Sequence, residues 1–316
     1  MDVYFYEAFK EEEEALRQHL EPNISFDLTS NTVQETGHES PPARLISIRT
    51  QSIIPAEWSS AIDGILSRST GYDHLKAYQS KIQTPLPCGY LEEYATQAVA
   101  EHAILLMMSL FRKLPSQEKQ FLRFQRDGLT GRECRGKNLL VVGVGRIGSE
   151  IVHIGQGLGM NVYGVDLVQR LDSLKYCEKE EGIAWADAVI CAMNLTKFNR
   201  GYFSYSLLKK AKPGAVFVNI ARGEHASTAD LIMLEEERHL GGIGLDVYED
   251  EPMTASEFRS GTSDVSAQVR KLLSFPNVLL TPHNAFNTAE AVERKSRLTT
   301  EQVEYFLKNR KFKRQL

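Results

Sequence analysis

Three glycines near the middle of the chain, Gly143, Gly145 and Gly148, restrict the fold more than any other feature of the sequence. They follow an apolar run at 139–142 that is typical of a buried strand, and they precede a segment with the pattern of a helix. At this spacing the first glycine permits a tight turn, the second lets a ligand approach the backbone, and the third allows close packing of helix against strand. The segment predicts a strand, turn and helix whose N-terminus can bind a pyrophosphate.

An acidic residue follows the last glycine at the distance that a dinucleotide site requires. Asp166 closes a second strand-like run at 161–165. A carboxylate in this place accepts hydrogen bonds from an adenosine ribose and repels a 2′-phosphate. We therefore expect a site for NAD rather than NADP, and the alternative is a glycine turn without a ligand.

Length and charge limit the partners that the chain can have. Its 316 residues suit two domains, each able to bury a core. A net charge of -4 gives no general attraction to nucleic acid or to anionic lipid, and we predict neither partner. The basic segment 308–314 is more typical of a solvated chain end than of a nucleic-acid site. The near-apolar run from Ala103 to Phe111 is too short to cross a bilayer.

The cysteines favour a reducing compartment. Cys88, Cys134, Cys177 and Cys191 are scattered and form no C-x-x-C pair. The first six residues lack the basic and then apolar order of a signal peptide. We expect a cytoplasmic protein, and we assign no metal ligand.

Strand-like and helical segments alternate along most of the chain. The first 95 residues give a small α/β unit with strand-like segments at 3–6 and 45–48 and an acidic helix at 10–20. An amphipathic helix over 288–309 could carry the chain back to this unit. The segments between them predict a parallel sheet that helices cover on both faces and that binds ligands beyond the carboxyl ends of its strands. The strands of that sheet are expected at 139–142, 162–165, 188–192, 215–219, 242–245 and 278–280.

A long helical stretch separates the two parts, from Ala98 to about Arg126. Its first half is apolar on nearly every face, and such a helix must be buried on more than one side. We expect Ala103 to Met108 to pack on a second copy of the chain and form a homodimer. Burial within a single subunit is the alternative.

Three ionisable residues stand just beyond predicted strand ends. Arg222 follows the strand at 215–219, Glu251 follows the strand at 242–245, and His283 follows the last strand. Each could also be an ordinary surface residue, since arginines at strand ends often form ion pairs and acidic stretches are usually solvated. Their common placement at one edge of the sheet favours a site.

The three residue types suit hydride transfer to a 2-oxo acid. A guanidinium can hold a carboxylate with two parallel hydrogen bonds and polarise the neighbouring carbonyl. An imidazolium can protonate the carbonyl oxygen as the hydride arrives and recover the proton in the reverse direction. A carboxylate beside the imidazole favours its charged form.

Five motifs in order, together with a sixth segment near the start of the chain, resemble the signatures of the D-isomer-specific 2-hydroxyacid dehydrogenases and cover nearly its whole length. They are STGYD at 69–73, VAEH at 99–102, GVGRIG at 143–148, NIARG at 219–223, GLDVYEDEP at 244–252 and TPHNAF at 281–286. The resemblance implies two doubly wound α/β domains, with a Rossmann NAD-binding domain inserted into a smaller flavodoxin-like substrate-binding domain. The corresponding segments are 1–97 and 284–316 for the substrate-binding domain and 98–283 for the NAD-binding domain.

The resemblance also implies roles for individual residues. Arg222 would bind the substrate carboxylate and carbonyl, His283 would be the acid and base, and Glu251 rather than Glu249 would pair with His283. Formate-oxidising members carry glutamine in place of Glu251, so that branch is disfavoured. The residues expected at the substrate are Thr70, Gly71, Tyr94 and Phe286, and those expected at NAD are Gly143, Gly145, Arg146, Ile147, Gly148, Asp166, Met193, Asn194, Asn199, Ala221 and Asp246.

The long polar connection from Pro252 to Phe275 resembles that of D-lactate dehydrogenase-like members. It makes a pyruvate-like 2-oxo acid, reduced to D-lactate, the first expectation for the substrate. Arg49 and Gln51 lie where lactate-type members present apolar or aromatic side chains, so a more polar or dicarboxylic acid is the alternative. A protein of another class, the NAD-binding corepressor of the C-terminal-binding-protein kind, shares this scaffold.

Overall fold

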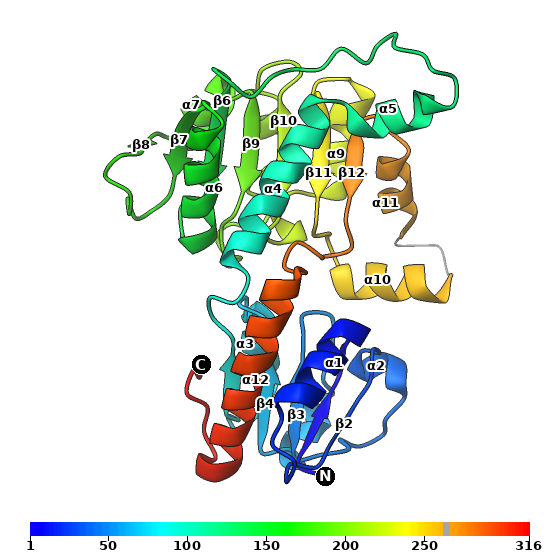
Figure 1. Cartoon of the computed structure of the whole chain (residues 1–316), viewed down its shortest axis with the longest axis vertical. Helices are drawn as coiled ribbons and strands as arrows, with labels where there is room; N and C mark the ends of the chain where they lie inside the picture. Colours follow the sequence, from blue (N-terminus) through cyan, green and yellow to red (C-terminus); the bar gives the residue numbers. More distant parts are fainter. Residues whose placement is uncertain (262–265) are drawn as a thin grey trace. The chain divides into compact units, whose positions relative to one another are not determined.

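The computed structural model describes residues 1–261 and 266–316, and the chain divides into two compact units. Unit 1 comprises residues 1–95 and 287–316, and unit 2 comprises residues 96–286 (Figure 1). The α/β fold class expected from the sequence is confirmed in both units. The assignment of the substrate to unit 1 stays a prediction.

Unit 1 is built on a sheet of five parallel strands. Their spatial order is β2-β1-β3-β4-β5, which is the flavodoxin-like order. The strand-like segments expected at 3–6 and 45–48 form β1 and β3, while the short β2, β4 and β5 carry no comparable sequence signal. The strands are β1 (Val3–Phe5), β2 (Phe26–Leu28), β3 (Leu45–Ile48), β4 (Gly64–Ser67) and β5 (Cys88–Tyr90).

Helices cover both faces of this sheet. On one face, α2 (Val33–Thr36), the 3-10 helix η1 (Ala56–Ser60) and α3 (Asp73–Gln79) bury apolar side chains against the strands. On the other face, α1 (Lys10–His19) packs on α12 (Ala289–Asn309). The helix expected at 288–309 is confirmed as α12. The Thr288 side chain caps its N-terminus by accepting a hydrogen bond from the backbone of Ala291.

Unit 2 contains a sheet of seven parallel strands in the order β12-β11-β10-β9-β6-β7-β8. This is the Rossmann order with an added strand beyond β11. All six strands expected from apolar runs are present, and only the two-residue edge strand β8 was not expected. The strands are β6 (Asn138–Val142), β7 (Asn161–Val165), β8 (Lys175–Tyr176), β9 (Ala188–Cys191), β10 (Val216–Asn219), β11 (Gly242–Leu245) and β12 (Val278–Leu280).

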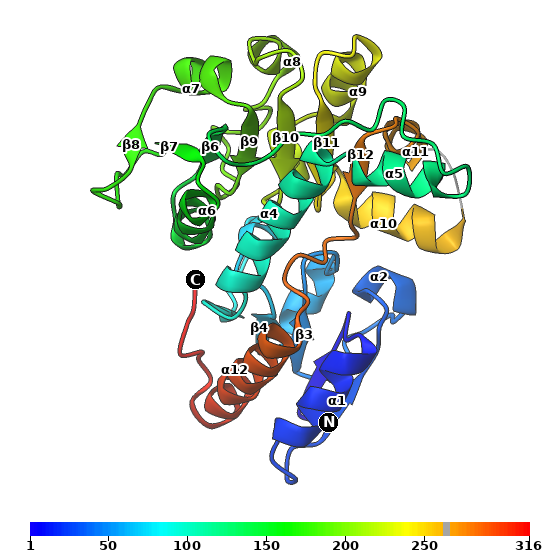
Figure 2. The ribbon, with the colours of Figure 1, turned by 45° about the horizontal axis from the view of Figure 1, so that its top comes forward.

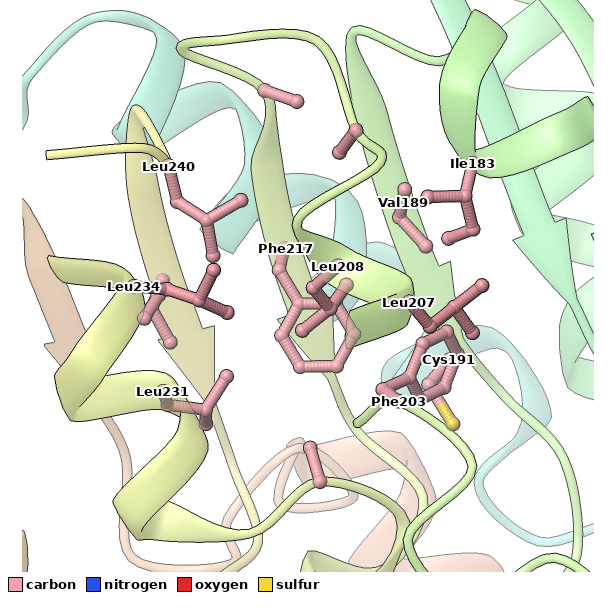
Figure 3. Packing of buried hydrophobic residues seen from close by; sticks show 14 of the residues in the cluster. Ile183, Val189, Cys191, Phe203, Leu207, Leu208, Phe217, Leu231, Leu234 and Leu240 are labelled. Carbon is pink, nitrogen blue, oxygen red and sulfur yellow. The ribbon is translucent and has the colours of Figure 1, made fainter. Parts of the chain in front are cut away.

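The helices of unit 2 lie on both faces of its sheet (Figure 2). Helices α4 (Thr96–Phe111) and α6 (Arg146–Gly157) cover one face, and α7 (Lys179–Trp185), α8 (Tyr205–Leu208) and α9 (Thr228–Glu236) cover the other. Leucine and phenylalanine side chains from α8, α9 and the segments beside them meet Phe217 and Val189 of the sheet in one apolar core (Figure 3). Among the described residues, no helix has the length and apolar character of a membrane span.

The long helical stretch expected from Ala98 to about Arg126 is not continuous, and it ends earlier than expected. Helix α4 ends at Phe111, Lys113 adopts a left-handed conformation with φ of 52°, and a second helix, α5 (Leu114–Phe121), begins there. Pro115 lies in the first turn of α5, where its missing N–H costs nothing, whereas inside a continuous helix it would break a hydrogen bond. Within this chain α4 is not buried on every side either, since Leu105 is 57% exposed.

Two helices occupy most of the described part of the polar connection from Pro252 to Phe275. They are α10 (Glu251–Ser260) and α11 (Ser266–Leu273). Helix α10 ends at Ser260, and Gly261 after it adopts a left-handed conformation. Thr262, Ser263 and Asp264, which continue this polar run, lie outside the described residues.

A buried carboxyl group on α9 should make the stability of unit 2 depend on pH. Burial raises the pKa of Glu235 from 4.5 to about 7, and its Oε1 has no hydrogen-bond partner among the described residues. Because the folded pKa lies above the unfolded one, the folded state prefers the protonated carboxyl group. This preference is fully present below pH 4.5 and is lost as the pH rises through 7.

Glu235→Gln should therefore raise the free energy of unfolding at pH 8 by up to about 3 kcal/mol and leave it nearly unchanged at pH 4.5. Urea unfolding at the two pH values measures the difference. The control is Glu236→Gln, since the neighbouring Glu236 is half exposed and pairs with Lys271 at the surface. An equal gain at both pH values would contradict the assignment to an ionised Glu235.

Candidate active site

The glycine turn after β6 has a shape that fits a dinucleotide. Gly143 has a φ of 93°, and a Cβ there would lie 2.5 Å from the backbone nitrogen of Met193. A Cβ on Gly148 would lie 1.9 Å from the carbonyl oxygen of Gly143, so α6 can approach β6 only with glycine at this position. A Cβ on Gly145 would meet no protein atom within 4 Å, so the middle glycine faces open space. The backbone is accessible at the place where the motif expects a pyrophosphate.

Asp166 lies at the carboxyl end of β7 and holds the glycine turn. Its Oδ2 accepts a hydrogen bond of 2.6 Å from the backbone of Val144, and its Oδ1 accepts one of 2.9 Å from Val168. The carboxylate is half-buried and stands next to the first turn of α6, which begins at Arg146. A ribose hydroxyl beside this turn would meet an acceptor that the backbone already orients.

The loop after β9 supplies three more of the residues expected at NAD. Met193 lies against the glycine turn, and Asn199 organises the rest of the loop. The Asn199 amide donates to the carbonyl of Asn194 at 2.8 Å and accepts from the backbone of Thr196 at 2.7 Å. The role of Asn194 and Asn199 toward the cofactor stays a prediction, but the structure shows that Asn199 shapes the loop.

Arg222 follows β10 in an extended conformation and is half-buried. Its Nη1 donates to the carbonyl of Ala221 at 2.8 Å, and its own carbonyl accepts from the side chain of Asn219 at 2.7 Å. Gly223 explains how the loop reaches the neighbouring strand, because a Cβ there would lie 1.8 Å from the carbonyl carbon of Tyr248. The segments after β10 and β11 are therefore in direct contact.

His283 and Glu251 form a close pair. The Nδ1 of His283 lies 2.6 Å from Oε1 of Glu251, and the two side chains are 18% and 13% exposed. His283 has a φ of 49°, an uncommon conformation for a residue other than glycine and one that tends to occur at functional sites. Glu249 is engaged elsewhere, since it accepts a hydrogen bond of 2.9 Å from the backbone of Thr228 at the start of α9.

Asp246 fixes the turn that carries His283. The Asp246 side chain is fully buried, and its oxygens accept hydrogen bonds from the side chain of Thr281 at 2.5 Å and from the backbones of Asn284 at 2.8 Å and Ala285 at 2.9 Å. Sequence reasoning expected Asp246 at NAD, and that role stays a prediction. The observed role is to hold both sides of the histidine turn.

Two further residues that the sequence analysis did not assign support this turn. His102 on α4 places its Nε2 3.1 Å from the hydroxyl of Thr281, and Tyr248 donates to the carbonyl of Thr281 at 2.5 Å. Burial and the nearby carboxylates of Asp246 and Glu251 raise the pKa of Tyr248, which keeps the phenol protonated as a donor. Both residues lie inside motifs, His102 in VAEH and Tyr248 in GLDVYEDEP, but no sequence spacing connects either of them with Thr281.

The expected substrate residues of unit 1 lie after β4 and β5. Thr70 is exposed and Gly71 half-buried, and among the described residues the backbone N–H groups of both donate to no other protein group. The side chain of Tyr94 is 4% exposed, and its carbonyl accepts from Arg294 at 2.9 Å. Phe286, at the end of unit 2, is also buried.

The segment after β3 is held by one carboxylate. Glu7 accepts hydrogen bonds from the backbones of Arg49 at 2.8 Å, Gln51 at 3.1 Å and Ser52 at 3.2 Å. The guanidinium of Arg49 lies 5.8 Å from the ring centre of Phe9. Whether Arg49 or Gln51 selects the substrate stays a prediction.

A Rossmann sheet, a glycine turn with an acid after the next strand, and a histidine–glutamate pair define an oxidoreductase that uses a dinucleotide. The comparisons with known proteins narrow this class. A family model described as "D-isomer specific 2-hydroxyacid dehydrogenase, NAD binding domain" matches residues 104–285. The chain therefore belongs to the D-isomer-specific 2-hydroxyacid dehydrogenase family, and it is an NAD-dependent enzyme.

Relatives match over nearly the whole chain. It is 30% identical to 2-hydroxyacid dehydrogenase A of Aspergillus oryzae over 305 residues, which cover 92% of this chain and 86% of that one. It is 29% identical to a D-lactate dehydrogenase of Streptococcus agalactiae, with 91% of this chain and 89% of that one covered. Among solved structures, D-lactate dehydrogenase of Aquifex aeolicus in complex with NAD and lactic acid matches with a TM-score of 0.83 and 27% identity, covering 97% of this chain and 96% of that one.

The carboxylate of Asp166 should set the preference for NADH over NADPH. Asp166→Ser removes the negative charge that would repel a 2′-phosphate, so the ratio of kcat/KM with NADPH to kcat/KM with NADH should rise about tenfold or more. Steady-state rates with each cofactor measure the ratio. Asp172→Ser, at an exposed position on the same connection, is the matched control and should leave it unchanged. An unchanged ratio in Asp166→Ser would show that another residue selects the cofactor.

Proposed function

We propose that this enzyme catalyses the reversible reduction of a small 2-oxo acid to the D-2-hydroxy acid, with a pyruvate-like acid as the first candidate. The observation that carries the proposal is the 2.6 Å pair of His283 and Glu251 at the end of the sheet that binds the dinucleotide. His283 follows β12 and Arg222 follows β10, and the parallel strand β11 lies between these two strands. The relatives named D-lactate dehydrogenase support the choice of a small substrate.

The protein residues divide the work as follows. NADH, when bound, supplies the hydride that adds to the carbonyl carbon of the substrate. Arg222 holds the substrate carboxylate with two parallel hydrogen bonds and draws electron density toward the carbonyl oxygen. In unit 1, the backbone N–H groups of Thr70 and Gly71 are assigned to the substrate carboxylate.

His283 donates a proton to the carbonyl oxygen, which becomes the hydroxyl group of the product. Because Nδ1 faces Glu251, Nε2 is the nitrogen that transfers the proton. Glu251 stabilises the charged imidazole before the transfer and keeps the ring oriented during it. In the reverse direction the neutral imidazole recovers the proton from the hydroxyl group.

Substrate profiling tests the proposal. Purified protein is mixed with NADH and a panel of 2-oxo acids that includes pyruvate, longer aliphatic acids and oxaloacetate, and NADH oxidation is followed by absorbance. We expect the highest kcat/KM with a small monocarboxylic acid and a D-configured product. A preference for oxaloacetate would favour the dicarboxylic alternative, and no oxidation with any acid would contradict the proposal.

We also infer a cytoplasmic homodimer. All four cysteines are free thiols, as expected in a reducing compartment. The dimer is supported by the apolar side chains that α4 leaves exposed, Leu105 and Met108. Light scattering at micromolar concentration tests the subunit number, and the mass of a single chain would contradict it.

A further inference from the structure

An ionic cluster is buried in unit 1, apart from the residues assigned to hydride and proton transfer. The side chains of Glu12, Arg68 and Lys295 are each 0% exposed. Oε1 of Glu12 lies 2.8 Å from Nε of Arg68 and 2.9 Å from Nζ of Lys295. Burial would raise the pKa of Glu12, but the charges of Arg68 and Lys295 outweigh it and hold the pKa low. The carboxylate is therefore ionised, and it lies between the guanidinium of Arg68 and the amino group of Lys295, whose pKa burial lowers to about 7.

Stability alone does not explain such a cluster. Removing three charged groups from water costs several kcal/mol each, and apolar side chains of similar size often stabilise a core at least as well. The cluster also occupies a particular place, since Arg68 is the first residue after β4 and leads directly into the turn at Ser69, Thr70 and Gly71. Its position suggests a role for the turn.

Arg68 joins the carboxyl ends of three strands. Besides Glu12, its guanidinium donates to the carbonyl of Tyr6, which follows β1, at 2.6 Å and to the hydroxyl of Ser47 on β3 at 3.0 Å. Ser47 in turn donates to the carbonyl of Leu66 on β4 at 3.0 Å. A planar guanidinium that donates in three fixed directions cannot shift without losing one of these bonds. The backbone at Arg68 is thus fixed relative to β1 and β3.

The turn is braced on its other side by hydroxyl groups. The Ser69 hydroxyl donates to the carbonyl of Gly71 at 2.8 Å and lies 2.7 Å from the hydroxyl of Ser67. The Ser67 hydroxyl also lies 2.8 Å from Nε2 of His74 on α3. The backbone from Arg68 to Gly71 is therefore held at both ends, while its N–H groups at Thr70 and Gly71 have no other protein partner in the described chain.

We propose that Arg68, anchored on Glu12, is a positioning residue that sets the orientation of the Thr70 and Gly71 N–H groups and thereby the affinity for the substrate carboxylate. The inference rests on the proposed function, which assigns these two groups to the carboxylate. Small displacements of a binding group have large effects on affinity and rate, so a fixed backbone at this point has a functional value beyond stability.

Arg68→Lys tests this role. Lysine keeps the charge next to Glu12, but a single ammonium group cannot reach Tyr6 and Ser47 at the same time. The KM for the 2-oxo acid should rise about tenfold or more, while the Kd for NADH, measured by fluorescence, should stay within about twofold because unit 2 binds the dinucleotide.

Lys295→Met is the matched control. It removes the amino group that contacts Glu12 in the same buried cluster and leaves the three bonds of Arg68 in place, so the KM should stay close to that of the wild type. Ser47→Ala is the second variant, for use if Arg68→Lys does not fold. It removes one of the three bonds of Arg68 and should raise the KM by a smaller factor. An unchanged KM in Arg68→Lys, or an equal rise in Lys295→Met, would overturn the proposal.

A binding measurement separates this inference from the proposed function. Oxamate, a 2-oxo acid analogue that cannot be reduced, is titrated calorimetrically into the wild type and Arg68→Lys in the presence of NADH. About tenfold weaker oxamate binding in Arg68→Lys supports the positioning role. Equal binding overturns that role even if the wild type is active. Tight oxamate binding by a wild type that reduces no 2-oxo acid would contradict the proposed function alone.

Discussion

Replacing His283 with alanine should lower kcat by a factor of about 100 to 10,000 while the affinity for NADH stays nearly unchanged. The reason is that His283 supplies the proton for the carbonyl oxygen and, in the described structure, contacts Glu251 rather than the glycine turn. Single-turnover kinetics with the preferred 2-oxo acid, together with fluorescence titration of NADH, measure the two quantities separately.

The matched control for this variant is His153→Ala. His153 lies on α6 of the same unit with a side chain that is 54% exposed, so its removal should change neither quantity. A loss of NADH affinity in His283→Ala as large as the loss of kcat would identify His283 as a structural residue and would contradict its catalytic role.

Replacing Arg222 with lysine should lower kcat/KM for the 2-oxo acid. The expected loss of transition-state stabilisation is about 2 to 4 kcal/mol, by analogy with the loss of one oxyanion donor. This corresponds to a factor of about 30 to 1,000. Lysine keeps the positive charge but cannot donate two parallel hydrogen bonds to a carboxylate and also polarise the carbonyl. Steady-state kinetics with the preferred acid give the ratio.

Arg200→Lys serves as the control for the arginine substitution. Arg200 is 60% exposed and forms a long ion pair of 3.7 Å with Glu224, so its replacement should leave kcat/KM unchanged. Near-normal kcat/KM in Arg222→Lys would mean that a point charge is enough at this position. It would contradict the proposal that Arg222 donates two parallel hydrogen bonds to the carboxylate.

The elements that the sequence predicted well are those whose signal is local. The apolar strands of unit 2 are buried on both faces and appear as continuous runs, so their limits were predicted to within one residue. The strands β2, β4 and β5 of unit 1 have no such run, because Asp27 interrupts β2, Gly89 interrupts β5, and β4 has only two apolar residues between Gly64 and Ser67. The break between α4 and α5 was missed because the pattern on both sides is helical and the interruption is a single left-handed residue, Lys113.

The candidate site shows the same division. The glycine turn, Asp166, Arg222, Glu251 and His283 could all be nominated from motifs, since each stands at a strand end. The supports of the histidine turn, His102 and Thr281, are 179 residues apart, and no periodicity or spacing connects them. Their contact depends on the packing of α4 against β10, β11 and β12.

The sequence by itself determined that the chain has a dinucleotide-binding sheet and which residue types stand at its carboxyl edge, because backbone periodicity and the small size of glycine act within a few neighbouring residues. Only the tertiary structure showed that Glu249 binds the backbone at the start of α9 and that Asp246 serves the histidine turn. It also decided that Glu12, Arg68 and Lys295 share one buried site. These contacts join residues far apart in the chain, and their energies depend on burial and on distances of a few ångströms that appear only when the strands and helices pack.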